Sequence, residues 1–217
     1  SNRLQRTYHA GETTDLNRLV QLVKQRFPGK AIMVFGYSLG GNSLLKWLGE
    51  QGGEAGINAA AAVSVPFDLY SCTDRMNRGF SRVYQKHFVD LLKASARRKF
   101  SSLPPLFDVG NIEEIRTLRE FDNRITAPLH GFKNAEDYYS KSSCKAFLKT
   151  IRVPTLIMNS LDDPFLEVSS FPSSSEVSPQ VELEYHRKGG HAAFITGSPW
   201  NKSGWTETRV PEFFKTH

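Results

Sequence analysis

Apolar positions near the start of the chain follow a helical spacing and then form a short continuous run. The stretch from Thr13 to Phe27 carries its apolar side chains on one helical face, which predicts a helix with Thr13 or Thr14 as its N-cap; the face consists of Leu16, Leu19, Val20, Val23 and Phe27. The run "AIMVF" at 31–35 follows the turn "PGK" and predicts a strand that is buried on both faces.

The same alternation repeats immediately downstream. Leu44, Leu45 and Leu48 continue at helical spacing until "GEQGG", and "INAAAAVSVP" at 57–66 predicts a second buried strand. Two further runs, "VPTLIMNS" and "VELEYH", predict strands late in the chain. Helices alternating with short buried strands are typical of an α/β fold with a mostly parallel sheet.

The segment between the second and third strands has a different pattern, since it predicts helices alone. The longest is "GFSRVYQKHFVDLLKASARRKF", whose apolar face comprises Phe80, Val83, Tyr84, Phe88, Leu91 and Leu92. A helical insertion at this place is typical of a lid over the carboxyl edge of a sheet. We therefore divide the chain into a core of residues 1–66 and 151–217 and a helical cap of residues 67–150.

The composition excludes several classes of protein. Among 217 residues, 39% are hydrophobic and 23% charged, which is typical of a globular domain, and no apolar run is long enough to cross a bilayer. The net charge is +6, but the basic residues are dispersed, and the cluster "ARRKF" at 96–100 ends a helix, where cations suit the helix dipole. We expect no nucleic-acid partner. The two cysteines, Cys72 and Cys144, do not make a disulfide framework, so we expect free thiols and a cytoplasmic protein.

The hexapeptide "GYSLGG", which ends at Gly41, lies where a predicted strand meets a predicted helix. A sharp turn of this kind holds its central residue at positive φ and exposes that side chain. Gly36 and Gly40 would leave room for the turn, and Gly41 would let the helix pack close to the sheet. The pattern predicts Ser38 as a nucleophile, with the backbone N–H of Leu39 directed at a developing oxyanion.

A nucleophilic serine needs a base and an orienting carboxylate, which in this type of sheet follow in the order Asp or Glu, then His. "LDDPF" follows one predicted strand and "RKGGHAAF" follows the next, which predicts His191 as the base rather than His186 or His87. The residue before a proline is held extended, which favours Asp163 as the orienting acid. Asp162 would then cap the turn or bind backbone N–H groups.

Sequence motifs that bind metals or cofactors do not offer an alternative to the serine hydrolase hypothesis. The sequence lacks H-E-x-x-H and C-x-x-C patterns, and "GYSLGGNS" has neither the lysine nor the spacing of a phosphate-binding loop. We expect no cofactor and no metal ion.

The quoted motifs extend over nearly the whole chain and resemble the YheT-like α/β-hydrolases, a family of bacterial esterases with lipid-acting eukaryotic relatives. The resemblance rests on "YHAGETTDL", "GYSLGGN", "SVPFDL", "GFSRVYQKHF", "LREFDNRITAPLHGF", "DYY", "LDDPF" and "GGHAAF". It implies an α/β-hydrolase fold in which Ser38 is the nucleophile, His191 the general base and Asp163 the orienting acid.

The resemblance also implies that a front part of the fold is missing from this sequence. Family members begin with further strands and an "HG"-type loop that supplies a second oxyanion donor, and this sequence starts after that region. We therefore expect an open sheet edge along residues 32–35. Such an edge would pair with another copy, retain a separate N-terminal fragment or cause aggregation.

The resulting functional hypothesis is a serine hydrolase that cleaves small-molecule carboxylic esters through an acyl-enzyme. The aromatic residues of the helical segment would form either the core of the lid or the lining of an acyl pocket; they are Phe80, Tyr84, Phe88, Phe132, Tyr138 and Tyr139. Two alternatives stay open. An acyltransferase or thioesterase would use the same triad, and a non-catalytic module of this fold would bind a ligand or partner.

Overall fold

The four strands predicted from the sequence form one parallel sheet, as the alternating pattern indicated. The computed structural model describes residues 6–192, 194–198 and 201–217. Its four-stranded sheet has the order β1-β2-β3-β4, and each neighbouring pair is parallel. The strands are β1 (Met33–Tyr37), β2 (Ala59–Val63), β3 (Thr155–Ser160) and β4 (Val181–His186).

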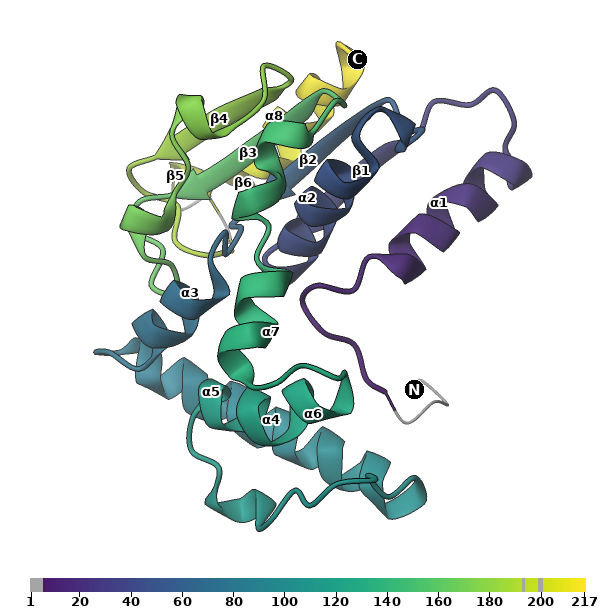
Figure 1. Cartoon of the computed structure of the whole chain (residues 1–217). Helices are drawn as coiled ribbons and strands as arrows, with labels where there is room; N and C mark the ends of the chain where they lie inside the picture. The colour runs from purple at the N-terminus through teal and green to yellow at the C-terminus, as the bar shows by residue number, and fades with distance from the viewer. Residues whose placement is uncertain (1–5, 193, 199–200) are drawn as a thin grey trace.

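Helices cover both faces of this sheet (Figure 1). One face is covered by α2 (Leu39–Gln51), where Leu44 and Trp47 meet Ala60 and Ala62. The helix α1 (Thr14–Arg26) packs at the margin of the same face. The helix α8 (Trp205–Lys215) packs on the other face, where Phe213 contacts the alternate residues of β2 and β3. The small alanine side chains of β2 let helices approach closely from both sides.

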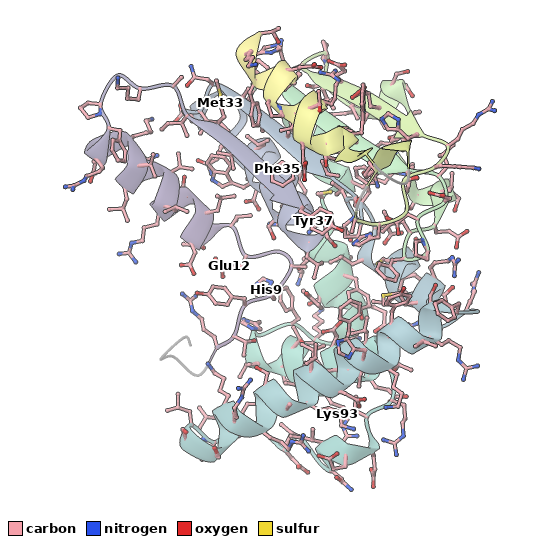
Figure 2. The ribbon with its side chains drawn as sticks, turned by 180° about the vertical axis from the view of Figure 1, so that it is seen from behind. His9, Glu12, Met33, Phe35, Tyr37 and Lys93 are labelled. Carbon is pink, nitrogen blue, oxygen red and sulfur yellow. The ribbon has the colours of Figure 1, made fainter. Side chains whose placement is uncertain are left out.

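The chain between β2 and β3 is helical, as expected from its spacing. Its elements are α3 (Leu69–Met76), α4 (Ser81–Ser102), η2 (Ile112–Glu114), α5 (Leu118–Phe121), the π-helical η3 (Asp122–Thr126), α6 (Ala127–Leu129), α7 (Ala135–Ser142) and η4 (Lys145–Thr150). Figures 1 and 2 place α3 to α7 beyond the carboxyl ends of the strands, on the side to which Tyr37 lies in β1.

The face that α4 buries is not the face that its sequence predicted. Phe80, Val83 and Leu91 are more than half exposed, whereas Gln85 and Lys93 are buried. The Lys93 ammonium donates hydrogen bonds to the carbonyl oxygens of residues 113 and 115, at 3.1 and 3.3 Å, so its burial is compensated (Figure 2). The predicted apolar face instead turns partly toward a cavity that is described below.

Two expectations near the start of the chain were also wrong. Val20 is the buried residue of α1, while Leu19 and Phe27, predicted on the same inward face, are exposed. The strand β1 was predicted to be buried on both faces, but Phe35 is half exposed; the expected open edge is present, because β1 is the edge strand of the described sheet. Met33, Phe35 and Tyr37 follow one another along this edge in Figure 2.

The described residues end with elements that the sequence did not predict. A two-stranded antiparallel sheet is formed by β5 (Ile195–Ser198) and β6 (Asn201–Gly204), and it leads directly into α8. Neither Cys72 nor Cys144 forms a disulfide, in agreement with the predicted free thiols. Among the described helices, none combines the length and apolar character required to cross a membrane.

The open edge of β1 leads to a prediction about association. The 217-residue chain, expressed by itself, should elute as a species larger than its 24.5 kDa monomer, because unpaired strand edges bearing apolar side chains recruit further strands. Phe35→Lys should shift the population toward monomer in size-exclusion chromatography with light scattering. Phe27→Lys, which changes a similarly exposed phenylalanine after α1, should not do so. A monomeric unmodified chain would contradict this account.

Candidate active site

Ser38 occupies the tight turn between β1 and α2. Its backbone has φ 52° and ψ −122°, a conformation that L-residues rarely adopt, and it is the positive-φ position that the hexapeptide predicted. The Ser38 N–H donates a hydrogen bond to the Val63 carbonyl oxygen of β2 at 2.9 Å, which anchors the turn to the sheet. A Cβ on Gly36 would lie 2.7 Å from the Gly40 carbonyl oxygen, so this position requires glycine.

The other two glycines of the turn differ from each other. A Cβ on Gly41 would lie 2.8 Å from the side chain of Val65, in agreement with the expected close packing of α2 on the sheet. A Cβ on Gly40 would meet no atom within 4 Å, so the expectation that sterics demand glycine there was wrong. The reason is that Gly40 faces the cavity beside Ser38 rather than packed backbone.

The three predicted side chains lie in a connected row. The Nε2 atom of His191 is 3.0 Å from the Ser38 Oγ atom, and its Nδ1 atom is 2.7 Å from an Asp163 carboxylate oxygen. An imidazole that donates from Nδ1 to the carboxylate presents an unprotonated Nε2 toward the serine hydroxyl. The arrangement can therefore remove a proton from Ser38.

The Asp163 carboxylate is buried and fixed in direction. Its side chain is 1% exposed, and its second oxygen accepts a hydrogen bond from the Phe165 N–H at 2.9 Å. The Phe165 ring lies against the His191 ring, with 4.6 Å between the centroids. A buried carboxylate with these contacts fixes the orientation and tautomer of the imidazole.

Asp162 does not contact His191, but it holds the loop on which His191 lies. One carboxylate oxygen accepts hydrogen bonds from the Gly189 and Gly190 N–H groups at 3.0 and 2.8 Å, and from the Ser160 hydroxyl at 2.5 Å. The Ser160 bond is the largest cause that lowers the pKa of the Asp162 carboxyl, and the Gly190 bond acts in the same direction. Backbone binding by Asp162 was expected from the sequence, although its partners were not.

Two residues that the sequence did not single out bind the backbone of His191. The Tyr37 hydroxyl and the Ser64 hydroxyl both donate to the His191 carbonyl oxygen, at 2.7 and 2.6 Å. Burial, with a smaller contribution from Asp163, raises the pKa of Tyr37, so the phenol keeps the proton that it donates. Ser64 has φ 54° directly after β2, a conformation that residues other than glycine rarely adopt, and nothing in the sequence marks it for this contact.

Leu39 is the first residue of α2, so its backbone N–H lies in the first turn, where helical N–H groups lack intrahelical acceptors. The partial positive charge of the helix N-terminus lies at the same place. The competing histidines lie elsewhere: His186 packs against Phe194 and Trp205, and His87 is exposed on α4.

A cavity of about 650 Å³ opens beside Ser38 and His191. Its wall is mainly apolar and comes largely from the helical segment, including Leu69, Met76, Phe88 and Leu118, while Leu166 comes from the loop after β3. Of the aromatic residues singled out in the sequence, Phe88, Tyr138 and Tyr139 line this cavity. Phe132 instead packs at the margin of the cluster around α7, and Phe80 is exposed.

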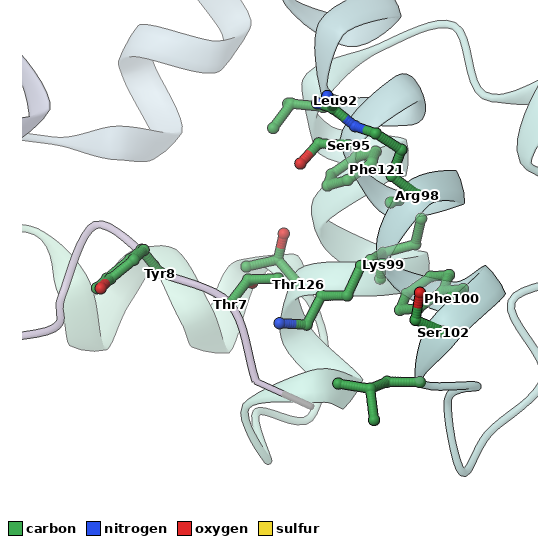
Figure 3. Close-up of a pocket in the computed structure, with 13 residues that line it drawn as sticks. Thr7, Tyr8, Leu92, Ser95, Arg98, Lys99, Phe100, Ser102, Phe121 and Thr126 are labelled. Atoms are coloured by element: carbon green, nitrogen blue, oxygen red, sulfur yellow. The ribbon is translucent and has the colours of Figure 1, made fainter. Parts of the chain in front are cut away.

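A second cavity of about 650 Å³ adjoins the first. Tyr8, Leu92 and Thr126 belong to the walls of both, so they form the partition between them. Figure 3 shows the second cavity running along α4, with Ser95, Arg98, Lys99 and Ser102 on one side. Among the described residues, no group of three or more His, Cys, Asp or Glu is placed to hold a metal ion.

Comparison with known proteins relates this geometry to a family. The protein YheT of Escherichia coli (strain K12) is 39% identical over 100% of this chain and 64% of YheT. A Saccharomyces cerevisiae protein named monoacylglycerol lipase is 32% identical over 89% of this chain and 45% of that protein. The Pyrococcus furiosus esterase Pf2001, at 19% identity and a TM-score of 0.53, matches 97% of this chain and 64% of its own, which shows the shared fold.

This chain spans between about half and two thirds of the length of the curated relatives that it matches. The family model described as "alpha/beta hydrolase fold" matches residues 1–198, and the parallel sheet with its strand-to-helix turn at Ser38 has the corresponding architecture. The chain therefore belongs to the α/β-hydrolase fold family.

Proposed function

We propose that the protein is a serine hydrolase that cleaves carboxylic esters through an acyl-enzyme. The observation that carries this proposal is the row of contacts from Ser38 Oγ through the His191 imidazole to the buried Asp163 carboxylate. The names of the relatives, which include a monoacylglycerol lipase and phospholipases, support ester chemistry for the whole protein.

In the proposed reaction, Ser38 Oγ attacks the ester carbonyl while His191 Nε2 accepts the hydroxyl proton. The imidazolium returns this proton to the departing alcohol, and a water molecule then releases the acyl group by the same steps. Asp163 keeps the Nδ1–H tautomer and stabilises the imidazolium. The Leu39 N–H stabilises the oxyanion; in this fold a second donor comes from a loop after an earlier strand, which we expect in the whole protein.

We further propose that residues 67–150 act as a cap on a core formed by residues 1–66 and 151–217. The apolar wall that this helical segment gives to the cavity suits the acyl portion of an ester. The Ser81 hydroxyl of α4 donates to the Pro164 carbonyl oxygen at 2.6 Å, next to Asp163, which ties the segment to the site.

Replacement of the nucleophile tests the proposal directly. In the full-length protein, Ser38→Ala should abolish labelling by a fluorophosphonate probe and lower turnover of an activated ester by several orders of magnitude, with an unchanged circular dichroism spectrum. Ser43→Ala, which changes a second serine on the cavity wall, should preserve labelling. Absence of labelling in the unmodified protein would favour a non-catalytic binding module, and acyl transfer to an acceptor other than water would favour a transferase.

Replacement of the two neighbouring aspartates by asparagine should change two different properties of the protein. Asp163→Asn should reduce turnover by about 10⁴-fold, because the amide favours the wrong imidazole tautomer. Asp162→Asn should mainly lower the melting temperature, because it weakens the bonds to Gly189 and Gly190. A larger catalytic loss at Asp162 than at Asp163 would reverse these assignments.

The effect of Asp162→Asn on the melting temperature should depend on pH. The folded-state pKa of Asp162 is lowered, so its carboxylate stabilises the fold above the unfolded-state pKa, and this contribution is lost as the pH falls through the folded-state pKa. The difference in melting temperature between the protein and Asp162→Asn should therefore be largest near neutral pH and shrink in acid. A difference that stayed constant down to strongly acidic pH would contradict the role of the carboxylate charge.

A further inference from the structure

A carboxyl group on the wall of the catalytic cavity has no part in the proposed ester cleavage. Asp122 is the first residue of the π-helical η3, and it lines the same cavity as Ser38 and His191. The wall near it is mainly apolar or aromatic and includes Tyr138 and Tyr139 of α7, but Thr73 and Thr126 also belong to it. An acyl chain would gain nothing from a carboxylate at this place.

The charge of Asp122 is only partly compensated by the protein. One carboxylate oxygen accepts a hydrogen bond from the Thr126 hydroxyl at 2.7 Å, and the other accepts one from the Tyr139 hydroxyl at 2.8 Å. Within the described part of the chain, no lysine, arginine or histidine forms an ion pair with it. A carboxylate in such surroundings ordinarily forms an ion pair or fills its remaining acceptor positions with further hydrogen bonds.

Burial disfavours the charged form of several titratable groups around Asp122. Burial raises the pKa of the Tyr138 and Tyr139 hydroxyls and raises that of the Cys72 thiol to about 12, while burial lowers the pKa of His9 on the same cavity wall. Burial also raises the pKa of Asp122 itself to about 6, so the carboxylate predominates at pH 7.5. An uncompensated carboxylate therefore faces the space where a substrate would lie.

Resting on the proposed function, we propose that Asp122 binds a hydroxyl group on the alcohol portion of the substrate. Each carboxylate oxygen already accepts one neutral hydroxyl and can accept a second hydrogen bond. An unsubstituted acyl chain carries no donor, so the donor must come from the alcohol. The substrate class is accordingly an ester of a polyhydric alcohol rather than of a simple alkyl alcohol.

A hydroxyl fits this site better than a quaternary ammonium group does. The ammonium would bring charge but no hydrogen-bond donor, and it would leave the remaining acceptor positions of the carboxylate unfilled. A hydroxyl fills one of them within an otherwise apolar wall. One hydrogen bond to a charged group gives discrimination of about 10- to 100-fold against an analogue that lacks the donor.

The test compares two esters of matched shape in the full-length protein. These are 2,3-dihydroxypropyl butyrate and 2-methylbutyl butyrate, in which methyl groups replace both hydroxyls. The ratio of their kcat/KM values should be about 10 to 100 at pH 7.5 and should fall toward 1 in Asp122→Asn. Asp90→Asn, which changes an exposed aspartate of α4 away from the cavity wall, should leave the ratio unchanged.

A pH series gives a second readout that needs no variant. The ratio in the unmodified protein should narrow as the pH falls through about 6, because protonation of Asp122 weakens it as an acceptor. A change in pH that impairs the chemical steps in general affects both esters alike and cancels in the ratio. A purely structural role of Asp122 would move the absolute rates and the melting temperature but not this pH-dependent ratio.

Several outcomes would overturn the assignment. A ratio that neither Asp122→Asn nor pH changes would remove Asp122 from substrate recognition. If the protein preferred 3-hydroxybutyrate esters over butyrate esters, and this preference depended on Asp122, the hydroxyl that Asp122 binds would belong to the acyl portion of the substrate. A comparable preference for choline butyrate over 3,3-dimethylbutyl butyrate would assign a cation instead. Failure of the proposed function would be distinct, since Ser38 would then resist the fluorophosphonate probe and neither butyrate would be hydrolysed.

Discussion

The arrangement of the site depends on how the loop after β4 is held over the ends of the other strands. His191 follows β4 at one edge of the sheet, whereas Ser38 follows β1 at the other edge, so the loop has to cross the carboxyl ends of β3 and β2. Asp162 after β3 binds its glycine N–H groups, and Ser64 after β2 and Tyr37 of β1 bind the His191 carbonyl oxygen. The parallel register brings all of these anchors to one edge. With its backbone bound on several sides, His191 lies where its imidazole can bridge the serine hydroxyl and the buried carboxylate.

Sequence alone predicted the parts of this site that depend on local patterns. The strand-to-helix turn at Ser38 follows from the glycines and the change in apolar spacing, and the choice of Asp163 follows from the proline after it. The Tyr37 and Ser64 hydrogen bonds could not be predicted, because they join residues more than 120 positions apart and involve a backbone oxygen. No residue type marks such an acceptor in a sequence.

The errors in the fold have a related physical origin. Periodicity predicts that a helix buries its most apolar face, but α4 buries Gln85 and Lys93 and leaves Phe80 and Val83 exposed. The prediction failed because the carbonyl oxygens that compensate Lys93 come from η2 and the residue after it, about twenty positions along the chain. The prediction that both faces of β1 are buried failed at Phe35, because burial of a strand face depends on what packs against it, which the apolar run alone does not specify.

The cavity combines two requirements that conflict energetically. Its apolar wall lowers the free energy of bound hydrocarbon, but the same wall raises the cost of the Asp122 carboxylate, whose pKa of about 6 reflects this environment. A carboxylate kept there without a cation destabilises the free protein relative to an apolar side chain of similar size. The bonds from Thr126 and Tyr139 offset part of that cost and fix the direction of both carboxylate oxygens. Since Thr126 also belongs to the partition toward the second cavity, the same bond holds that wall in place. The polar group is thus fixed in a rigid position before any substrate arrives, which is the condition under which a single hydrogen bond can discriminate between ligands.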